Sequence, residues 1–132
     1  MTVLPSFSDI EKAHTRIRPY IHKTPVLSSQ SINEIVGANL FFKCENLQKV
    51  GAFKFRGACN SVFSLTDEEA QNGVCTHSSG NHAAALALAA QMRGIPAYIV
   101  MPENAPEIKK IAVAGYGAQI SFCTPTLEAR ES

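Results

Sequence analysis

The sequence predicts an α/β fold in which helices cover a parallel sheet. Three short apolar stretches, residues 74–77, 97–101 and 119–123, have the length and composition of buried strands. Two longer helical segments, residues 80–93 and 105–114, lie between them, and each ends at a glycine. Strands and helices that alternate with short connections are typical of a parallel sheet packed against its crossover helices.

The region before these strands predicts shorter elements. Ser8 and Glu11 match a capping box, whose side chains satisfy free amides at a helix start. Apolar residues follow at helical spacing as far as Ile21, and Pro19 is expected to kink or shorten this helix. The remaining elements expected are a helix over 29–36 ending at Gly37, a strand over 40–44, a helix over 54–65 and a capped helix start at 66–69.

The composition is that of an ordinary globular protein. The chain has 132 residues, of which 45% are hydrophobic and 17% charged, so one domain is the natural expectation. No apolar run approaches the ~20 residues of a spanning helix, and no secretory signal precedes the first helix. The formal net charge is +1 and basic residues are scattered, which argues against nucleic-acid binding.

The cysteines predict a reducing compartment. Cys44, Cys59, Cys75 and Cys123 are widely spaced, with no Cys-x-x-Cys pair. Four reduced thiols are therefore expected, as is typical of cytoplasmic proteins. The four histidines do not combine with these cysteines at zinc-ligand spacing, so no metal site is expected.

The first candidate for chemistry is a lysine between two aromatic residues. Lys54 follows a glycine turn and is flanked by Phe53 and Phe55. An aromatic setting favours the neutral amine over the ammonium ion, and a neutral amine is what imine formation requires. The alternative is a surface lysine whose stem covers the two rings, with Arg56 solvated, and the local pattern alone favours that alternative.

The second candidate is the polar turn at residues 76–82, Thr-His-Ser-Ser-Gly-Asn-His. It lies between a predicted strand and a predicted helix, where parallel sheets bind their ligands. Open amides at a helix start suit a carboxylate or a phosphate. The alternative is a simple N-cap by Ser78 or Ser79, which explains one serine but hardly the whole polar run. His77 and His82 are weaker candidates as metal ligands.

A plain nucleotide-binding domain is disfavoured. The segment 115–118, Gly-Tyr-Gly-Ala, lacks the three-glycine dinucleotide fingerprint and follows a helix rather than a strand. It is better interpreted as a helix end that enters a strand.

Two segments together resemble a known family. Residues 51–58, Gly-Ala-Phe-Lys-Phe-Arg-Gly-Ala, followed by residues 78–82, Ser-Ser-Gly-Asn-His, resemble the fold-type II pyridoxal-phosphate enzymes. The resemblance is stronger to the serine racemase and threonine dehydratase branch, and within it to the eukaryotic-type racemases. Stretches at 23–27, 41–46, 94–97 and 110–117 support it. The resemblance implies a tryptophan synthase β-like fold, a three-layer αβα arrangement that is incomplete in this chain.

The resemblance assigns roles to residues in both segments. Lys54 is expected to form the internal aldimine with pyridoxal 5'-phosphate and to act as a base on one face of the substrate. Ser79 is expected to be the acid and base on the opposite face. Phe53 would pack near the cofactor ring, and Asn81 would bond its phenolic oxygen. The expected carboxylate-binding residues are Ser78, Ser79, Gly80, Asn81 and His82.

The implied activity is racemisation of serine together with elimination of ammonia from L-serine or L-threonine. Both reactions follow from one carbanion that the cofactor stabilises. The resemblance also implies a cytoplasmic homodimer in the full-length form, with ATP and Mg²⁺ as effectors. The positions that match an ATP site between subunits are Ser29, Gln30, Ser31, Lys49, Val50, Thr76 and Tyr116.

The family pattern also implies how the chain is divided. Residues 1–70 would be a segment of the large domain that carries the cofactor lysine, and residues 71–132 most of the small substrate-binding domain. The cofactor-phosphate loop and the metal site of full-length members would lie beyond residue 132, and Ala52 stands where serine is common. Residues 127–132 look like the start of a further helix. The alternative hypothesis is therefore an inactive short chain that acts only by association with full-length subunits.

Overall fold

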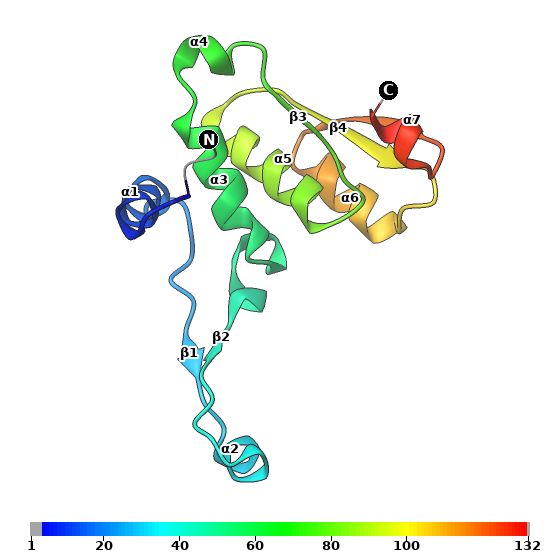
Figure 1. Cartoon of the computed structure of the whole chain (residues 1–132). Helices are drawn as coiled ribbons and strands as arrows, with labels where there is room; N and C mark the ends of the chain where they lie inside the picture. The colour runs from blue at the N-terminus through cyan, green and yellow to red at the C-terminus, as the bar shows by residue number, and fades with distance from the viewer. Residues whose placement is uncertain (1–3, 132) are drawn as a thin grey trace.

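A parallel sheet of three strands forms the body of the protein (Figure 1). The structure is a computed structural model that describes residues 4–131. The strands lie in the order β3, β4, β5, with Thr76 paired to Ile99 and Ile99 to Ile120. Their bounds are β3 Val74–His77, β4 Ala97–Pro102 and β5 Gln119–Cys123. The predictions for the first and third strands are confirmed, and the second is one residue longer than predicted.

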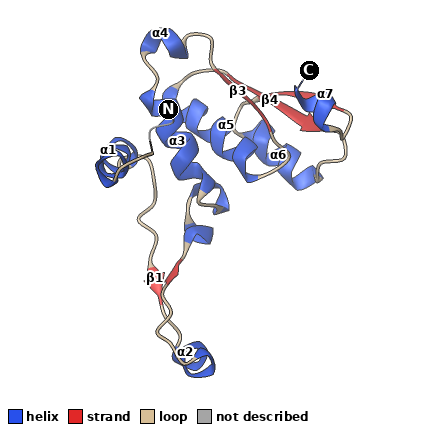
Figure 2. Ribbon diagram, viewed as in Figure 1, coloured by secondary structure: helices blue, strands red, loops and turns tan. Residues whose placement is uncertain are grey.

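Helices α5 (Asn81–Arg93) and α6 (Glu107–Gly115) connect these strands and pack side by side on one face of the sheet (Figure 2). Ala97, Ile99 and Met101 of β4 are buried, whereas Tyr98, between the first two, is 42% exposed and Val100 is half-buried. This alternation shows that α5 and α6 cover one face of β4. The short helix α7 (Leu127–Glu131) also contacts β4. The predicted α/β arrangement, a parallel sheet flanked by helices, is confirmed.

Helix α5 is buried around most of its circumference, because it lies between the sheet and helix α3 (Lys54–Ser64). Its side chains are small, so both neighbours approach it closely. The helix ends at Gly94, whose left-handed backbone has φ +76° and closes the last turn. The buried residues of α5 are Ala83, Ala85, Leu86, Ala87, Ala89 and Ala90.

Helix α1 (Phe7–Ile17) begins and ends earlier than predicted. Its capping box consists of Ser6 and Asp9, not Ser8 and Glu11. The Asp9 amide donates to Ser6 Oγ at 3.3 Å, and the Ser6 amide donates to Asp9 Oδ2 at 2.9 Å. The helix ends at Ile17 because Pro19 has no amide hydrogen with which to continue the ladder.

A narrow arm projects from the body (Figure 1). Strands β1 (Val26–Leu27) and β2 (Phe42–Lys43) pair antiparallel and carry helix α2 (Gln30–Val36) beyond them. The prediction for α2 is confirmed, with Ser29 and Gly37 as its caps. Of the strand predicted over 40–44, only residues 42 and 43 are in strand conformation. The apolar side chains that the arm exposes are Val26, Leu27, Ile32, Ile35, Val36, Phe41 and Phe42.

Short helical turns link the arm to the body. They are η1 (Glu45–Leu47) and η2 (Lys49–Gly51), which lead into α3. A further short helix, α4 (Asp67–Ala70), lies between α3 and β3. The predicted start of α4 is confirmed, since Thr66 and Glu69 form a capping box. All four cysteines are free thiols, as expected. No helix in residues 4–131 has the length and apolar character that crossing a membrane requires.

Gly73 is predicted to tolerate alanine much less than Gly94. Both have positive φ, +78° and +76°, but only at Gly73 would a Cβ meet backbone, 2.4 Å from the Pro96 carbonyl oxygen. Gly94→Ala should cost about 1 kcal/mol of unfolding free energy for strain, and Gly73→Ala at least ~2 kcal/mol more. Urea unfolding followed by circular dichroism measures both variants. Equal losses would contradict the close approach of Gly73 to Pro96.

Candidate active site

Lys54 is the first residue of α3, and its side chain is exposed. Its Nζ lies 5.3 Å from the centre of the Phe53 ring, which is itself 61% exposed. Phe55 points the other way and is fully buried. The lysine is therefore accompanied by one ring rather than flanked by two, because successive helical side chains point about 100° apart.

A cavity of about 310 Å³ lies beside Lys54. Helix α3 contributes small residues to its wall, which leaves room next to the amine. The polar turn at the start of α5 contributes His82. The lysine segment and the turn, predicted separately from the sequence, thus meet at one cavity. Its lining residues are Phe53, Lys54, Gly57, Ala58, Ser61 and His82.

The two helices that form this cavity are also joined at their other ends. Arg93, in the last turn of α5, donates hydrogen bonds to the carbonyl oxygens of Val62 and Leu65, the latter at 2.8 Å. The carboxyl ends of α3 and α5 are therefore adjacent. Their amino ends, which carry Lys54 and the polar turn, consequently lie on the same side of the body.

The polar turn leaves the start of α5 uncapped. Gly80 is the N-cap residue, and no side chain there forms a capping hydrogen bond, so the simple N-cap interpretation of the serines is wrong. Ser78 Oγ instead accepts from the Gly80 amide at 3.3 Å, and the Ser78 amide donates to the Val100 carbonyl at 3.0 Å. Uncapped amides at a helix start can receive an anion.

The expected substrate residues occupy neighbouring positions but do not all line the cavity. Ser78, Ser79 and Gly80 are half-buried in the turn, and Asn81 is exposed. Of the polar turn, only His82 belongs to the cavity wall beside Lys54. The expected substrate residues Ser78, Ser79, Gly80 and Asn81 therefore lie outside the wall of this cavity.

Two cationic side chains near the turn were missed by the sequence analysis. A Cβ placed on Gly80 would lie 3.3 Å from Lys109 Nζ, which comes from α6. Arg130 of α7 lines a second cavity, of about 430 Å³, together with Cys75, Thr76 and His77. Both follow later strands of the sheet, and the carboxyl ends of parallel strands share one edge. The position of these two residues after strands β4 and β5 could therefore have indicated from the sequence that they lie near the turn.

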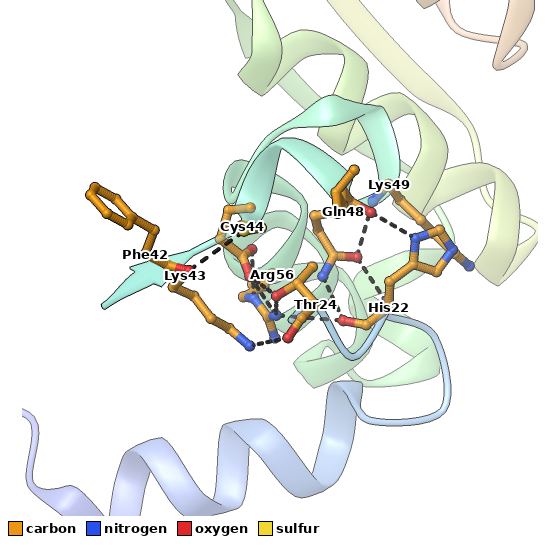
Figure 3. Close-up of polar contacts among 10 residues, drawn as sticks. His22, Thr24, Phe42, Lys43, Cys44, Gln48, Lys49 and Arg56 are labelled. Carbon is orange, nitrogen blue, oxygen red and sulfur yellow. Dashed lines mark hydrogen bonds and ion pairs between the residues drawn. The ribbon is translucent and has the colours of Figure 1, made fainter. Parts of the chain in front are cut away.

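A polar network holds the segment before Lys54 (Figure 3). Arg56 donates to both carboxylate oxygens of Glu45, from Nε at 2.8 Å and from Nη2 at 2.7 Å. Thr24 Oγ1, which is buried, donates to Glu45 Oε1 at 2.6 Å. The Arg56 hydrogen bonds lower the pKa of Glu45 to about 2, with burial opposing and Thr24 assisting this shift. Arg56 is thus paired, not solvated as the surface-lysine interpretation required.

Gln48 extends this network into the main chain. Its side chain is nearly fully buried. Its Oε1 accepts from the amides of His22 at 2.9 Å and of Lys49 at 3.0 Å, and its Nε2 donates to the His22 carbonyl at 2.8 Å. No buried side-chain nitrogen or oxygen in the part of the chain that the structure describes lacks a hydrogen-bond partner.

The positions matched to a nucleotide site are not gathered in one place. Ser29, Gln30 and Ser31 lie at the start of α2 on the arm, and Lys49 and Val50 lie in η2. Thr76 lies in β3, and Tyr116 is the C-cap residue of α6. Within residues 4–131, no group of three or more histidine, cysteine, aspartate or glutamate side chains is arranged to hold a metal ion.

An exposed lysine and the polar turn of a parallel α/β sheet thus share one cavity, as the resemblance to the pyridoxal-phosphate enzymes implies. The sequence matches the pyridoxal-phosphate dependent enzyme family over residues 17–132, and the chain belongs to this family. It is 58% identical over 127 residues to serine racemase from Dictyostelium discoideum, covering 96% of this chain and 39% of that protein. It is 53% identical over 128 residues to β-hydroxyaspartate dehydratase from Paracoccus denitrificans, covering 97% of this chain and 41% of that protein.

A solved structure supports the same relationship. Maize serine racemase superposes with a TM-score of 0.95 at 56% identity, covering 98% of this chain and 39% of that one. The chain is therefore a homologue of serine racemases and spans about two-fifths of the length of the relatives it matches.

Because of Glu45, the free energy of unfolding is predicted to fall at acidic pH. Its pKa is about 2 in the folded protein against an ordinary 4.5, so its contribution is complete above pH 4.5 and is lost as pH falls toward 2. We expect a loss of about 2 kcal/mol over that range, less than the full shift implies because the carboxylate is partly exposed. Glu45→Gln should remove this part of the slope in urea titrations at each pH.

Asp9→Asn is the matched control for Glu45→Gln. The pKa of Asp9 is also lowered, by its hydrogen bonds with Ser6, but this carboxylate is at the surface. Its replacement should change the slope less than Glu45→Gln does. An unchanged slope in Glu45→Gln would show that the ion pair with Arg56 does not contribute to acid sensitivity.

Proposed function

We propose that this chain is the N-terminal part of a pyridoxal-phosphate enzyme that racemises serine and eliminates ammonia from L-serine or L-threonine. The observation that carries the proposal is the single cavity shared by Lys54 and His82. Family membership supplies the cofactor class, and the names of the relatives supply the substrate class. The domain division at residue 70, a homodimeric assembly and regulation by ATP and Mg²⁺ are parts of the same proposal.

The residues present fit the cofactor. The cavity offers an accessible amine at Lys54 and an aromatic wall at Phe53, and Gly57 adds no side chain to obstruct a flat ring. No carboxylate lines it to repel a phosphate ester. Lys54 Nζ would hold the cofactor covalently, Phe53 would pack on its ring, and Asn81 would bond its phenolic oxygen. When bound, pyridoxal phosphate accepts the electron pair that remains after the α-proton leaves.

The chain's own side chains supply the proton transfers. Lys54 Nζ removes or returns the α-proton on one face, and Ser79 Oγ does so on the other. Removal on one face followed by return on the opposite face inverts the α-carbon. The open amides at the start of α5 bind the substrate carboxylate, with the Lys109 ammonium nearby.

A second candidate is dehydration of a β-hydroxy amino acid that carries a second carboxylate. The relative from Paracoccus is a β-hydroxyaspartate dehydratase. The observation that favours this candidate is the position of Lys109 Nζ beside Gly80. The helix amides can bind one carboxylate, and this additional cation can bind a second one.

Lys54 is predicted to be the lysine that reacts with pyridoxal phosphate. The amine and the aldehyde form a C=N bond with loss of water, and borohydride then donates hydride to give a stable secondary amine. Peptide mass spectrometry should find a much higher yield of this adduct at Lys54 than at other lysines, and Lys54→Arg should abolish it. Lys49→Arg is the control, because the Lys49 amine lies over the buried Phe55 instead. Uniform labelling of surface lysines would contradict the proposal.

Ser79 is predicted to matter more for racemisation than for elimination. We expect Ser79→Ala to reduce serine racemisation about 100-fold, the usual contribution of one acid or base, and L-serine elimination much less. The assay uses these 132 residues joined to the remaining part of the Dictyostelium racemase. Ser61→Ala, on the α3 side of the cavity, is the control and should leave the ratio unchanged. Equal losses in Ser79→Ala would refute the two-face assignment.

A further inference from the structure

The first turn of α3 is weakly held by its own backbone. Phe53 is the N-cap residue and forms no side-chain capping bond. Besides the bonds within the helix, two short-range hydrogen bonds lead into the turn, from the Phe55 amide to the Ala52 carbonyl at 3.3 Å and from the Arg56 amide to the Phe53 carbonyl at 3.0 Å. A helix start without a cap frays readily. Lys54 lies in this turn, so its position depends on other contacts.

On the exposed side of this turn, the Arg56 side chain makes the contact with a segment distant in the sequence (Figure 3). Its guanidinium donates two hydrogen bonds to Glu45, which lies in η1, 11 positions earlier. The pair is largely shielded, with 27% and 18% of the two side chains exposed. Two parallel hydrogen bonds between a planar guanidinium and a carboxylate fix orientation as well as distance.

The other end of this segment is fixed as well. Gln48 bonds both the amide and the carbonyl of His22, so the chain just before η2 cannot shift. From there the backbone turns through Val50 and Gly51, both left-handed with φ +57° and +67°. Such a conformation is unfavourable for a β-branched residue and persists only where its surroundings hold it. Gln48 and the Arg56–Glu45 pair hold the two ends of the span that contains Lys54.

We propose that the Arg56–Glu45 ion pair is the positioning element for Lys54, which it aims into the cavity shared with His82. The inference rests on the proposed function in one respect, that Lys54 is the cofactor lysine. Neither Arg56 nor Glu45 touches the reacting atoms. They act by keeping the first turn of α3 in one orientation relative to η1.

Beyond its contribution to folding stability, the pair fixes the position of the first turn of α3. The opposite side of α3 is anchored independently by Phe55, Ala58, Cys59 and Val62, all buried in the core. Loss of the pair therefore releases the exposed side of the first turn, which carries Lys54, while the buried side of the helix stays packed. Loss of core packing at Val62 has the opposite effect, since it lowers global stability and leaves the pair intact.

Hydrogen exchange on the full 132-residue chain without cofactor tests the positioning. Arg56→Lys keeps the charge and loses the two-pronged geometry, and Glu45→Gln keeps the shape and loses the charge. We expect both to speed exchange of the Phe55 and Arg56 amides about tenfold more than exchange in the buried middle of α5, which reports the change in global stability. Val62→Ala should speed exchange in α5 at least as much as exchange in the first turn of α3. If Arg56→Lys does not fold, Glu45→Gln decides the outcome.

Borohydride trapping of pyridoxal phosphate tests the consequence for Lys54. Both pair variants should lower the adduct at Lys54 at least fivefold relative to the adduct at the exposed Lys12, whereas Val62→Ala should not. The inference is overturned if Arg56→Lys and Glu45→Gln match the wild type in both measurements, or if Val62→Ala reproduces their loss. If the wild type shows no preference for Lys54, the proposed function fails, and hydrogen exchange still decides whether the pair fixes the turn.

Discussion

The packing of α3 against α5 is the constraint on which the site depends. Lys54 and His82 are 28 positions apart in the sequence, and the contact between α3 and α5 brings them to one cavity. It is close because α5 presents alanines to its neighbours and α3 contributes Ala58, Cys59 and Val62. Arg93 fixes the carboxyl ends of the two helices. A large residue in the alanine run would separate Lys54 from the polar turn before it affected either segment directly.

The part of the fold that the sequence predicted is the part with regular periodicity. Strand β3, helix α5 and strand β5 have short apolar or alanine-rich runs bounded by glycines, and their bounds agree with expectation to within a residue. The burial of Phe55 was also readable, since residues 55, 58, 59 and 62 follow the i, i+3, i+4, i+7 pattern of a buried helix face. Treating Phe53 and Phe55 as equivalent neighbours of Lys54 overlooked that pattern.

Other features could not be predicted, either because they depend on residues that are distant in the sequence or because two local alternatives fitted the pattern equally well. Ser6 and Ser8 each have an acid three residues later, so spacing alone did not decide which one caps α1. Strand β2 is two residues long because only two residues of β1 pair with it. The Arg56–Glu45 bond and the position of Lys109 beside Gly80 arise only once the chain has folded. In the site, sequence motifs indicated the lysine and the turn, while the fold supplied the surrounding charges.

The cationic side chains around the site fall into two groups, according to whether or not each forms an ion pair with an acid. Arg56 is neutralised by Glu45 and fully occupied with holding the chain, so it adds little positive potential near Lys54 and does not compete for an incoming anion. Within residues 4–131, neither Lys109 nor Arg130 forms an ion pair with an acid, although both lie beside the polar turn or its strand. An unpaired cation near uncapped helix amides attracts a carboxylate, whereas a paired one cannot. A chain with almost no net charge can thus present a local positive potential at the polar turn, because ion pairing occupies Arg56 and leaves Lys109 and Arg130 without an acidic partner within residues 4–131.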